Sequence, residues 1–491
     1  MSQHLPALQI IVPLFAAPIC ALIGHRIYSW LFAAVINLGT LWLALTNLNT
    51  VRESGEIVYS LGGWAAPWGI EYRIDPANAY VILIVALVGA VVTLYAPRSL
   101  TSEVDDDRHH LIYAMMMLCG AGLMGIAITG DAFNVFVFLE ISSLSAYALI
   151  AMGRKPRALT SAYQYLVMGT IGGTFILLGI GLMYQMTGTL NMADLAERLP
   201  AVTHTTTIRA ALAFLTVGVS IKLALFPLHV WLPNAYTYAP TVVTAFLAAT
   251  ATKVSFYVLA RVICTLFGAA LVFDAMSLDK ALMFFALLAI YAGSVVAIFQ
   301  KDVKRLLAYS SVAQIGYMVL GLSYGTVTGL TGGIVHLFNH ALMKGGLFMV
   351  VGCIIYRIGS SNIEDMRGLG KRMPFTMLAF VFGGLSLIGV PLTVGFVSKW
   401  YLILGALELG LWPVALAALM SSLLAVVYVW RVVEALYFGE PTGRAAEATE
   451  APLTLLAPTW LMIGGTILFG IITDTTVGVA QQAAEHLIGG M

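Results

Sequence analysis

The stretch His336–Gly346, HLFNHALMKGG, places two imidazoles and one ammonium group inside a long apolar run. In a helix, His336, His340 and Lys344 follow each other at intervals of four residues and therefore lie along one face. The surrounding residues from Leu330 to Tyr356 supply almost no other charge. Ionisable groups inside a membrane span are costly and usually mark an ion or proton path. The stretch therefore predicts a membrane helix whose ionisable side chains belong to an ion or proton path.

The composition of the whole chain agrees with a membrane protein. Of its 491 residues, 60% are hydrophobic and only 10% are charged, and the mean hydropathy is +0.91. An ordinary soluble domain has about 25% charged residues. The 25 Lys and Arg nearly balance the 24 Asp and Glu, without a block of like charge. This distribution argues against a nucleic-acid partner.

Motifs for cofactors, metals and covalent chemistry are missing from the sequence. The four cysteines lie far apart in apolar runs and have no metal or disulfide spacing, so we interpret them as core residues. The paired glycines lack the strand and acidic partner of a dinucleotide site, and we expect no cofactor. Between His336 and His340 there is no glutamate, and we expect no metal site. The sequence leaves open whether the chain counts as an enzyme.

About 20 apolar residues are needed to cross a bilayer, and this length divides the chain into fourteen predicted spans. The first has no basic segment before it and is followed by another span, which favours a membrane helix over a signal peptide. We expect one polytopic membrane domain over residues 1–491. The predicted spans are 5–24, 28–48, 78–96, 110–129, 132–152, 159–187, 208–230, 239–267, 280–299, 305–323, 327–357, 373–407, 411–438 and 453–478.

The loops between these spans differ strongly in basic residues. Loops on one side hold fourteen Lys and Arg, whereas those on the other side hold five. Because basic loops stay in the cytoplasm, we expect both termini on the non-cytoplasmic side of the cell membrane.

Six cations remain in the predicted spans when those at the very ends of spans are counted with the loops. Arg261 and Arg431 lie toward span ends, where we expect their side chains to reach the interface. The other four are Lys222, Lys253, Lys344 and Lys399. Among the acids, Glu140 is the clearest deep one, so a paired network is predicted. A lysine can gain or lose a proton as its partner moves, whereas arginine stays charged.

Two prolines predict broken helices next to two of these lysines. Pro227 follows Lys222 and cannot donate a hydrogen bond to an earlier carbonyl, and Pro391 precedes Lys399 with the same effect. Broken backbone at membrane depth survives where it is enclosed in protein or lines a cavity. One interrupted helix in each half of the chain is typical of transporters built from inverted repeats.

Together these stretches resemble the antiporter-like proton-translocating subunits shared by Mrp-type cation/proton antiporters, respiratory complex I and membrane-bound hydrogenases. The resemblance covers nearly the whole chain, and it implies an all-α fold of about fourteen helices. It also implies two inverted five-helix repeats with discontinuous helices, 110–267 and 280–438. The stretches are GDAFNVFVFLEISSLSAYALIA around Glu140, IKLALFPLHVWLPNAYTYAPTVVTAFLAATATK with Lys222 and Lys253, HLFNHALMKGG, and GVPLTVGFVSKW with Lys399.

The resemblance implies a proton path and a multisubunit setting. The family pattern assigns proton translocation to Glu140, Lys222, Lys253, His336, His340, Lys344 and Lys399. The implied partners are other membrane subunits, protons, sodium ions and the lipid bilayer. The sequences around Glu140 and Lys399 are most similar to the Mrp D-type subunit, and this resemblance implies coupling to sodium export. The alternatives are a subunit of a redox-driven pump and a scaffold whose buried charges only fix assembly.

Overall fold

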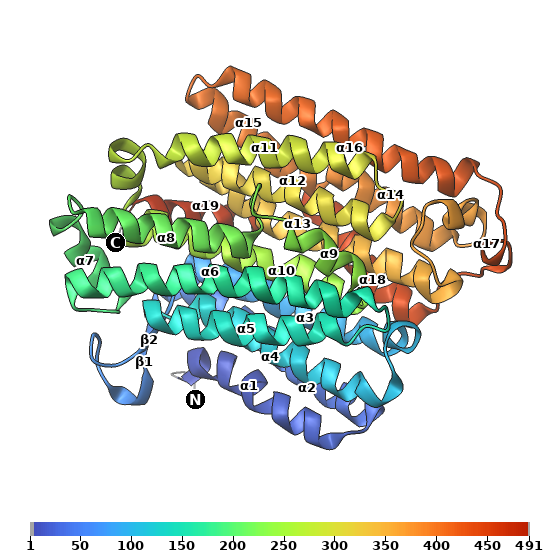
Figure 1. Cartoon of the computed structure of the whole chain (residues 1–491), viewed down its shortest axis with the longest axis horizontal. Coiled ribbons are helices and arrows are strands. Elements are labelled where there is room, and N and C mark those ends of the chain that lie inside the picture. Colours follow the sequence, from blue (N-terminus) through green and yellow to red (C-terminus); the bar gives the residue numbers. More distant parts are fainter. Residues whose placement is uncertain (1–3, 490–491) are drawn as a thin grey trace.

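The computed structural model describes residues 4–489, with the backbone alone for residues 274 and 275. Its long helices run side by side in one common direction (Figure 1). The two termini lie at the same end of this bundle, together with the strand pair and α7, and α17 lies at the opposite end. The chain therefore crosses the bundle an even number of times.

The elements alternate between long helices and short connecting pieces. In chain order they are α1 (Leu5–Ile23), α2 (Arg26–Ser54), β1 (Ile57–Ser60), β2 (Glu71–Ile74), α3 (Pro76–Glu103), α4 (His109–Ile128), α5 (Ala132–Ala151), α6 (Arg157–Thr187), α7 (Met192–Arg198), α8 (Thr206–Leu223), α9 (Trp231–Tyr238), α10 (Thr241–Ala260), a π-helical turn (Arg261–Leu266), α11 (Leu278–Ile298), α12 (Val303–Ser323), α13 (Val327–Ile358), α14 (Pro374–Ile388), α15 (Val394–Glu408), α16 (Trp412–Phe438), α17 (Arg444–Glu447), α18 (Leu453–Ile471) and α19 (Asp474–Gly489).

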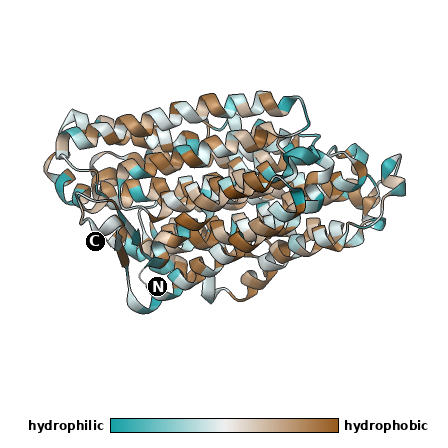
Figure 2. Cartoon of the chain, turned by 90° about the horizontal axis from the view of Figure 1, so that it is seen from below, coloured by the Kyte–Doolittle hydropathy of each residue, from teal (hydrophilic) through white to brown (hydrophobic). Residues whose placement is uncertain are grey.

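Thirteen of the described helices are long and apolar enough to cross a membrane. The predicted span 373–407 is divided between α14 and α15, which have 15 residues each. Figure 2 shows hydrophilic residues gathered at the two ends of the bundle and apolar residues between them. The expected all-α integral membrane fold is therefore confirmed.

The interior of the bundle is formed by α3, α10, α12 and α13, whose apolar segments are between 83% and 94% buried. Only 33% to 39% of the apolar segments of the peripheral helices α2, α6, α11 and α16 is buried. In a bilayer the residues that are not buried contact lipid or another membrane subunit. The charged stretch in α13 thus lies in the most enclosed part of the molecule.

Both predicted helix breaks are present. After α8 the backbone of Ala224 turns into the left-handed region, with φ of 60°, and the chain resumes as α9. After α14, Gly389 has φ of 90° and α15 begins five residues later. At the first break, the indole of Trp231 donates a hydrogen bond of 2.9 Å to the carbonyl of Ile221. This bond satisfies an acceptor that an unbroken helix would have used.

Two backbone contacts occur at matching places in the two halves of the chain. Asp131, before α5, forms a short antiparallel bridge with Asn191, and Asp302, before α12, forms the same bridge with Asn362. Each bridge consists of two N–H···O bonds between 2.8 and 2.9 Å. The first lies at the terminal end of the bundle, beside the strand pair, and the second lies at the opposite end. This relation is what inverted repeats predict.

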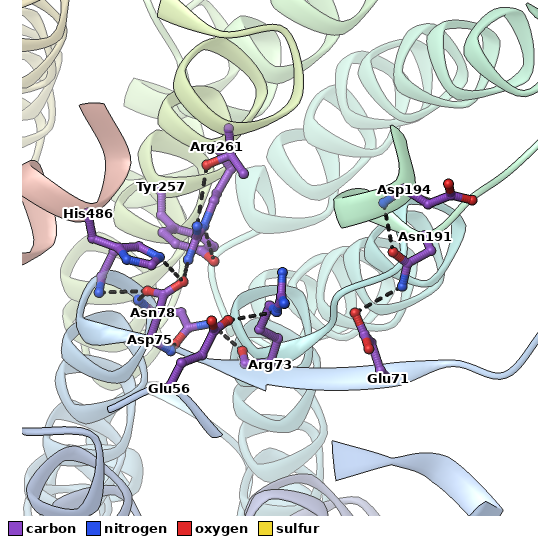
Figure 3. A network of polar contacts seen from close by, with 12 residues as sticks. Glu56, Glu71, Arg73, Asp75, Asn78, Asn191, Asp194, Tyr257, Arg261 and His486 are labelled. Atoms are coloured by element: carbon purple, nitrogen blue, oxygen red, sulfur yellow. Dashed lines mark hydrogen bonds and ion pairs between the residues drawn. The ribbon is translucent and has the colours of Figure 1, made fainter. Parts of the chain in front are cut away.

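A polar network closes the terminal end of the bundle (Figure 3). Asp75 caps α3, where it accepts hydrogen bonds from the backbone of Ala77 and Asn78 at 2.8 and 3.1 Å. Its carboxylate also pairs with Arg261 and lies 3.4 Å from the ring of His486 on α19. Arg261 is only 8% exposed. The expectation that Arg261 extends to the interface was therefore wrong, because a buried carboxylate compensates its charge in place.

The strand pair connects this network to the start of α5 and to α7. The strands are antiparallel, with Ile57 opposite Ile74 and Ser60 opposite Glu71. The carboxylate of Glu71 accepts a hydrogen bond of 2.9 Å from Asn191, and its carbonyl accepts one from Gly130. The hairpin therefore holds the start of α5 and the start of α7 in fixed relation to the polar network.

Replacing Asp75 by alanine is expected to lower the free energy of unfolding by about 3–5 kcal/mol. The reason is that the change removes a helix cap and leaves Arg261 as a buried, unpaired cation. Thermal unfolding of the purified protein in mild detergent measures the effect. Asp105→Asn is the matched control, since its pair with Arg154 is exposed and its loss is expected to change stability little. Equal stability of the two variants would contradict the assignment.

The pKa of His486 lies below its usual value of 6.5 because the ring is buried and because the positive charge of Arg261 lies close by. The charge of Arg73 acts in the same direction, whereas Glu56 acts against it. Asp75 would favour a charged ring, but its carboxylate already compensates Arg261. The docked ring is therefore neutral at neutral pH.

Docking of α19 is consequently expected to weaken as the pH falls through about 6.5. An undocked His486 takes up a proton there, whereas the docked ring does not, so the stabilisation is complete above this pH and decreases below it. Hydrogen exchange of residues 474–489 at about pH 5.5 and 7.5, corrected for intrinsic rates, measures this change. The His486→Gln variant should lose the pH dependence. An unaltered pH dependence in that variant would exclude His486 as the cause.

Candidate functional site

The seven predicted site residues come from five helices that pack in sequence. In the bundle α8 contacts α10, α10 contacts α13, and α13 contacts α15. The residues are Glu140 on α5, Lys222 on α8, Lys253 on α10, His336, His340 and Lys344 on α13, and Lys399 on α15. The packing arranges them as a series of ionisable groups through the interior of the bundle.

At one end of this series, Glu140 and Lys222 form an ion pair of 3.8 Å. The ammonium of Lys222 also donates a hydrogen bond of 2.8 Å to Ser143 on α5. Gly173 on α6 makes the space for the acid, since a Cβ there would lie 2.5 Å from a carboxylate oxygen of Glu140. The side chain of Glu140 is 28% exposed. It lies near the flank of the bundle, in the middle of the length of α5.

A small cavity of about 30 Å³ adjoins Lys222 and Ser143 and extends to Val254 and Ser255 on α10. Its size is sufficient for an ordered water. The next lysine of the series, Lys253, is fully buried and donates hydrogen bonds to Ala248 and, at 3.4 Å, to Thr252. No carboxylate among the described residues pairs with it.

His336, His340 and Lys344 on α13 are fully buried. The rings of His336 and His340 are stacked, with centroids 5.9 Å apart and planes at 11°. Nδ1 of His336 lies 2.8 Å from the hydroxyl of Ser398 on α15. Neither ring nitrogen of His340 has a hydrogen-bond partner among the described residues. The ammonium of Lys344 donates to Ser310 at 2.9 Å, on the neighbouring helix α12.

The direction of this stripe follows from the helix that carries it. Eight residues separate His336 from Lys344, which corresponds to about 12 Å along the axis of α13. Because α13 runs from one end of the bundle to the other, the three side chains follow each other in the direction in which the helices cross the membrane. The series therefore does not run only parallel to the membrane plane. His336 lies beside α15. Lys344 lies closer to the end of the bundle opposite the termini, where α13 ends.

Lys399 lies at the second helix break. Its ammonium donates hydrogen bonds to the carbonyls of Leu387 and Ile388 at 3.1 and 2.8 Å, and to Ser422 at 2.9 Å. These carbonyls end α14 and are free because the helix stops there. The ring of Tyr317 lies 5.0 Å from the ammonium, and a cavity of about 200 Å³ adjoins it. The break thus solvates the lysine in place of water.

Sequence reasoning missed one buried lysine. Lys304 directly precedes the predicted span 305–323, but in the structure it lies in the first turn of α12 and is fully buried. Its ammonium donates to the carbonyl of Ala239 at 2.6 Å and lies 4.0 Å from Glu103 on α3. The cap residue Asp302, which begins α12, is the signal that places Lys304 inside the helix.

Comparison with known proteins identifies the family of this chain. Residues 129–425 match the family NADH:quinone oxidoreductase/Mrp antiporter, TM. The chain is 42% identical to the N-type subunit of the NADH-quinone oxidoreductase of Desulforudis audaxviator (strain MP104C), with 99% of both proteins covered. It is 30% identical to the D-type subunit of the Na(+)/H(+) antiporter of Bacillus subtilis (strain 168), over 90% of this chain and 88% of the relative.

A solved structure shares the fold over almost the full length. The chain superimposes with a TM-score of 0.91 on a chain of the membrane-bound sulfane sulfur reductase, an archaeal respiratory membrane complex. The two are 34% identical, and the match covers 99% of this chain and 98% of that one. This chain is therefore a member of the NADH:quinone oxidoreductase/Mrp antiporter family of membrane proteins.

Proposed function

We propose that this chain translocates protons as one subunit of a multisubunit membrane complex. The observation that carries the proposal is the series of buried ionisable groups from the Glu140–Lys222 pair to Lys399 at the second helix break. Ionisable groups at this depth are expensive to maintain without a function. Lys253, Lys344 and Lys399 donate hydrogen bonds to neutral carbonyl and hydroxyl groups. Each of these three lysines can therefore release its proton without leaving an unpaired carboxylate behind.

In this proposal the Glu140–Lys222 pair is the switch. When the pair is closed, the carboxylate holds the proton on Lys222. When the pair opens, the proton can leave through the water-sized cavity toward α10. Lys253 then receives it, since it has hydrogen-bond acceptors but no competing carboxylate in the described structure.

The stacked histidines act as the relay to the far end. Each imidazole can accept a proton on one nitrogen and donate from the other. The hydroxyl of Ser398 connects His336 to α15, next to Lys399 in sequence. Lys344 and its partner Ser310 form a branch of the relay toward the end of the bundle opposite the termini.

We also propose that 110–267 and 280–438 are inverted five-helix repeats. The matched backbone bridges before α5 and α12, at opposite ends of the bundle, support this division. So does the presence of one broken helix in each segment. Two such halves would give the proton path an entrance and an exit on opposite sides.

Two couplings are candidates. The motifs around Glu140 and Lys399 favour an Mrp D-type subunit, in which proton flow is coupled to sodium export in the cell membrane. The relative that is named as an NADH-quinone oxidoreductase subunit, at 42% identity, and the sulfane sulfur reductase chain, at 34%, favour a redox-driven complex. Proteins that co-purify in mild detergent distinguish the two: small antiporter subunits support the first, and redox subunits support the second. In either case we propose that both termini face away from the cytoplasm.

Glu140→Gln and Lys222→Ala are each expected to reduce proton translocation by about tenfold or more, since each removes one partner of the switch. The assay is pH-gradient formation in vesicles that contain the assembled complex. Lys280→Gln, which changes an exposed cation in the first turn of α11, is the control. Full transport by assembled Glu140→Gln or Lys222→Ala complexes would support the scaffold alternative and sink the proposal.

Lys399→Arg separates a proton carrier from a structural cation. Arginine preserves the charge and the donors for the carbonyls of Leu387 and Ile388, and the adjacent cavity has room for it. Because arginine does not release its proton in proteins, we expect assembly to be normal and translocation to fall about as far as in Lys399→Ala. Activity close to that of the unchanged complex would show that only the charge is needed.

A further inference from the structure

A basic pocket opens at the end of the bundle opposite the termini. Its volume is about 300 Å³, which reaches the range of small-molecule sites. The walls come from the ends of α3 and α13, the α5–α6 loop, the α9–α10 junction and α17. Its four cations come from three separate segments: Arg154, Lys155, Arg357 and Arg444.

The donors of this pocket are only partly used. Arg154 pairs with Asp105 at 2.8 Å. Within the described structure, the side chains of Lys155 and Arg444 have neither a hydrogen bond nor an ion pair. Arg357 donates from Nη2 to the carbonyl of Glu450, but its buried Nε has no acceptor among the described residues. Buried donors normally have partners, so this one points to an acceptor that the chain does not supply.

The acid in the pocket does not neutralise these cations. The carboxylate of Glu103 accepts hydrogen bonds from the backbone and hydroxyl of Thr241 at 2.8 and 2.9 Å, and it faces Lys304. The guanidinium of Arg444 lies next to the backbone at the end of α13. Arg444 lies so close to the end of α13 that a Cβ on Gly359 would be 2.9 Å from its Nη1. The pocket therefore keeps an excess of positive charge.

We propose that this pocket binds a phosphate-type oxyanion, supplied by the headgroup of an acidic phospholipid or by free phosphate. Guanidinium groups match the oxygens of phosphate in bidentate geometry. Basic pockets between membrane helices at the cytoplasmic side are sites for acidic headgroups. A bound phosphate satisfies Nε of Arg357 and relieves the repulsion among four cations. It thereby joins the ends of α5 and α13 to α17.

The test uses the purified complex that contains the whole chain. Native mass spectrometry with dioleoyl phosphatidylglycerol, against dioleoyl phosphatidylcholine, probes the lipid source. Calorimetric titration with inorganic phosphate at constant ionic strength probes the free anion. Lys155→Gln/Arg444→Gln is the test variant, because both side chains are exposed and unpartnered and their loss leaves the fold intact. Lys371→Gln/Arg372→Gln makes the same change of charge in an exposed loop outside the pocket.

We expect saturable binding that the test variant weakens about thirtyfold and the control variant leaves unchanged. Preferential binding of phosphatidylglycerol identifies the headgroup, and binding of inorganic phosphate without lipid preference identifies the free anion. Both results support the site. Absence of both kinds of binding, as when an acidic segment of a partner subunit fills the pocket, overturns it. Equal weakening by the two variants also overturns it, since it would mean general charge attraction.

Discussion

The structure depends on how ammonium groups are solvated inside an apolar helix bundle. Lys344 and Lys399 are surrounded by carbonyls and hydroxyls of the protein, and neither has a carboxylate partner in the described chain. A buried charge with too few acceptors would be prohibitively costly. Acceptors of a neutral kind keep the charged form accessible without fixing it. This balance is what a site that gains and loses protons requires.

A helix break frees backbone carbonyls that can accept hydrogen bonds from a lysine. The break after α14 exposes the carbonyls that hold Lys399. Near Lys222, α8 packs closely against α6, since a Cβ on Gly172 would lie 3.1 Å from the carbonyl of Gly218 and a Cβ on Gly218 would lie 2.7 Å from the carbonyl of Gly172. This contact brings α8 near enough to the flank for Lys222 to reach Glu140.

Charges at the two ends of the bundle are handled differently from those in its middle. Asp75 compensates Arg261, and Glu103 compensates Lys304, each beside a helix terminus. Such pairs are costly to break but have no reason to exchange protons. In the middle, Lys253 and the two histidines lack any carboxylate partner among the described residues. The contrast separates the groups that hold the ends together from those suited to carry protons.

The sequence by itself determined the class of fold, the approximate spans, both helix breaks and the residues of the series. These follow from local rules: apolar length, the missing N–H of proline, and the cost of charge in a membrane. It could not determine that Arg261 and Lys304 are buried, because their compensating carboxylates lie about 200 positions away in the chain. Nor could it determine that Glu140 lies near a flank, that the α13 stripe runs across the bundle, or that cations from three segments share one pocket. Only the tertiary structure decided these points, since each depends on which helices pack side by side.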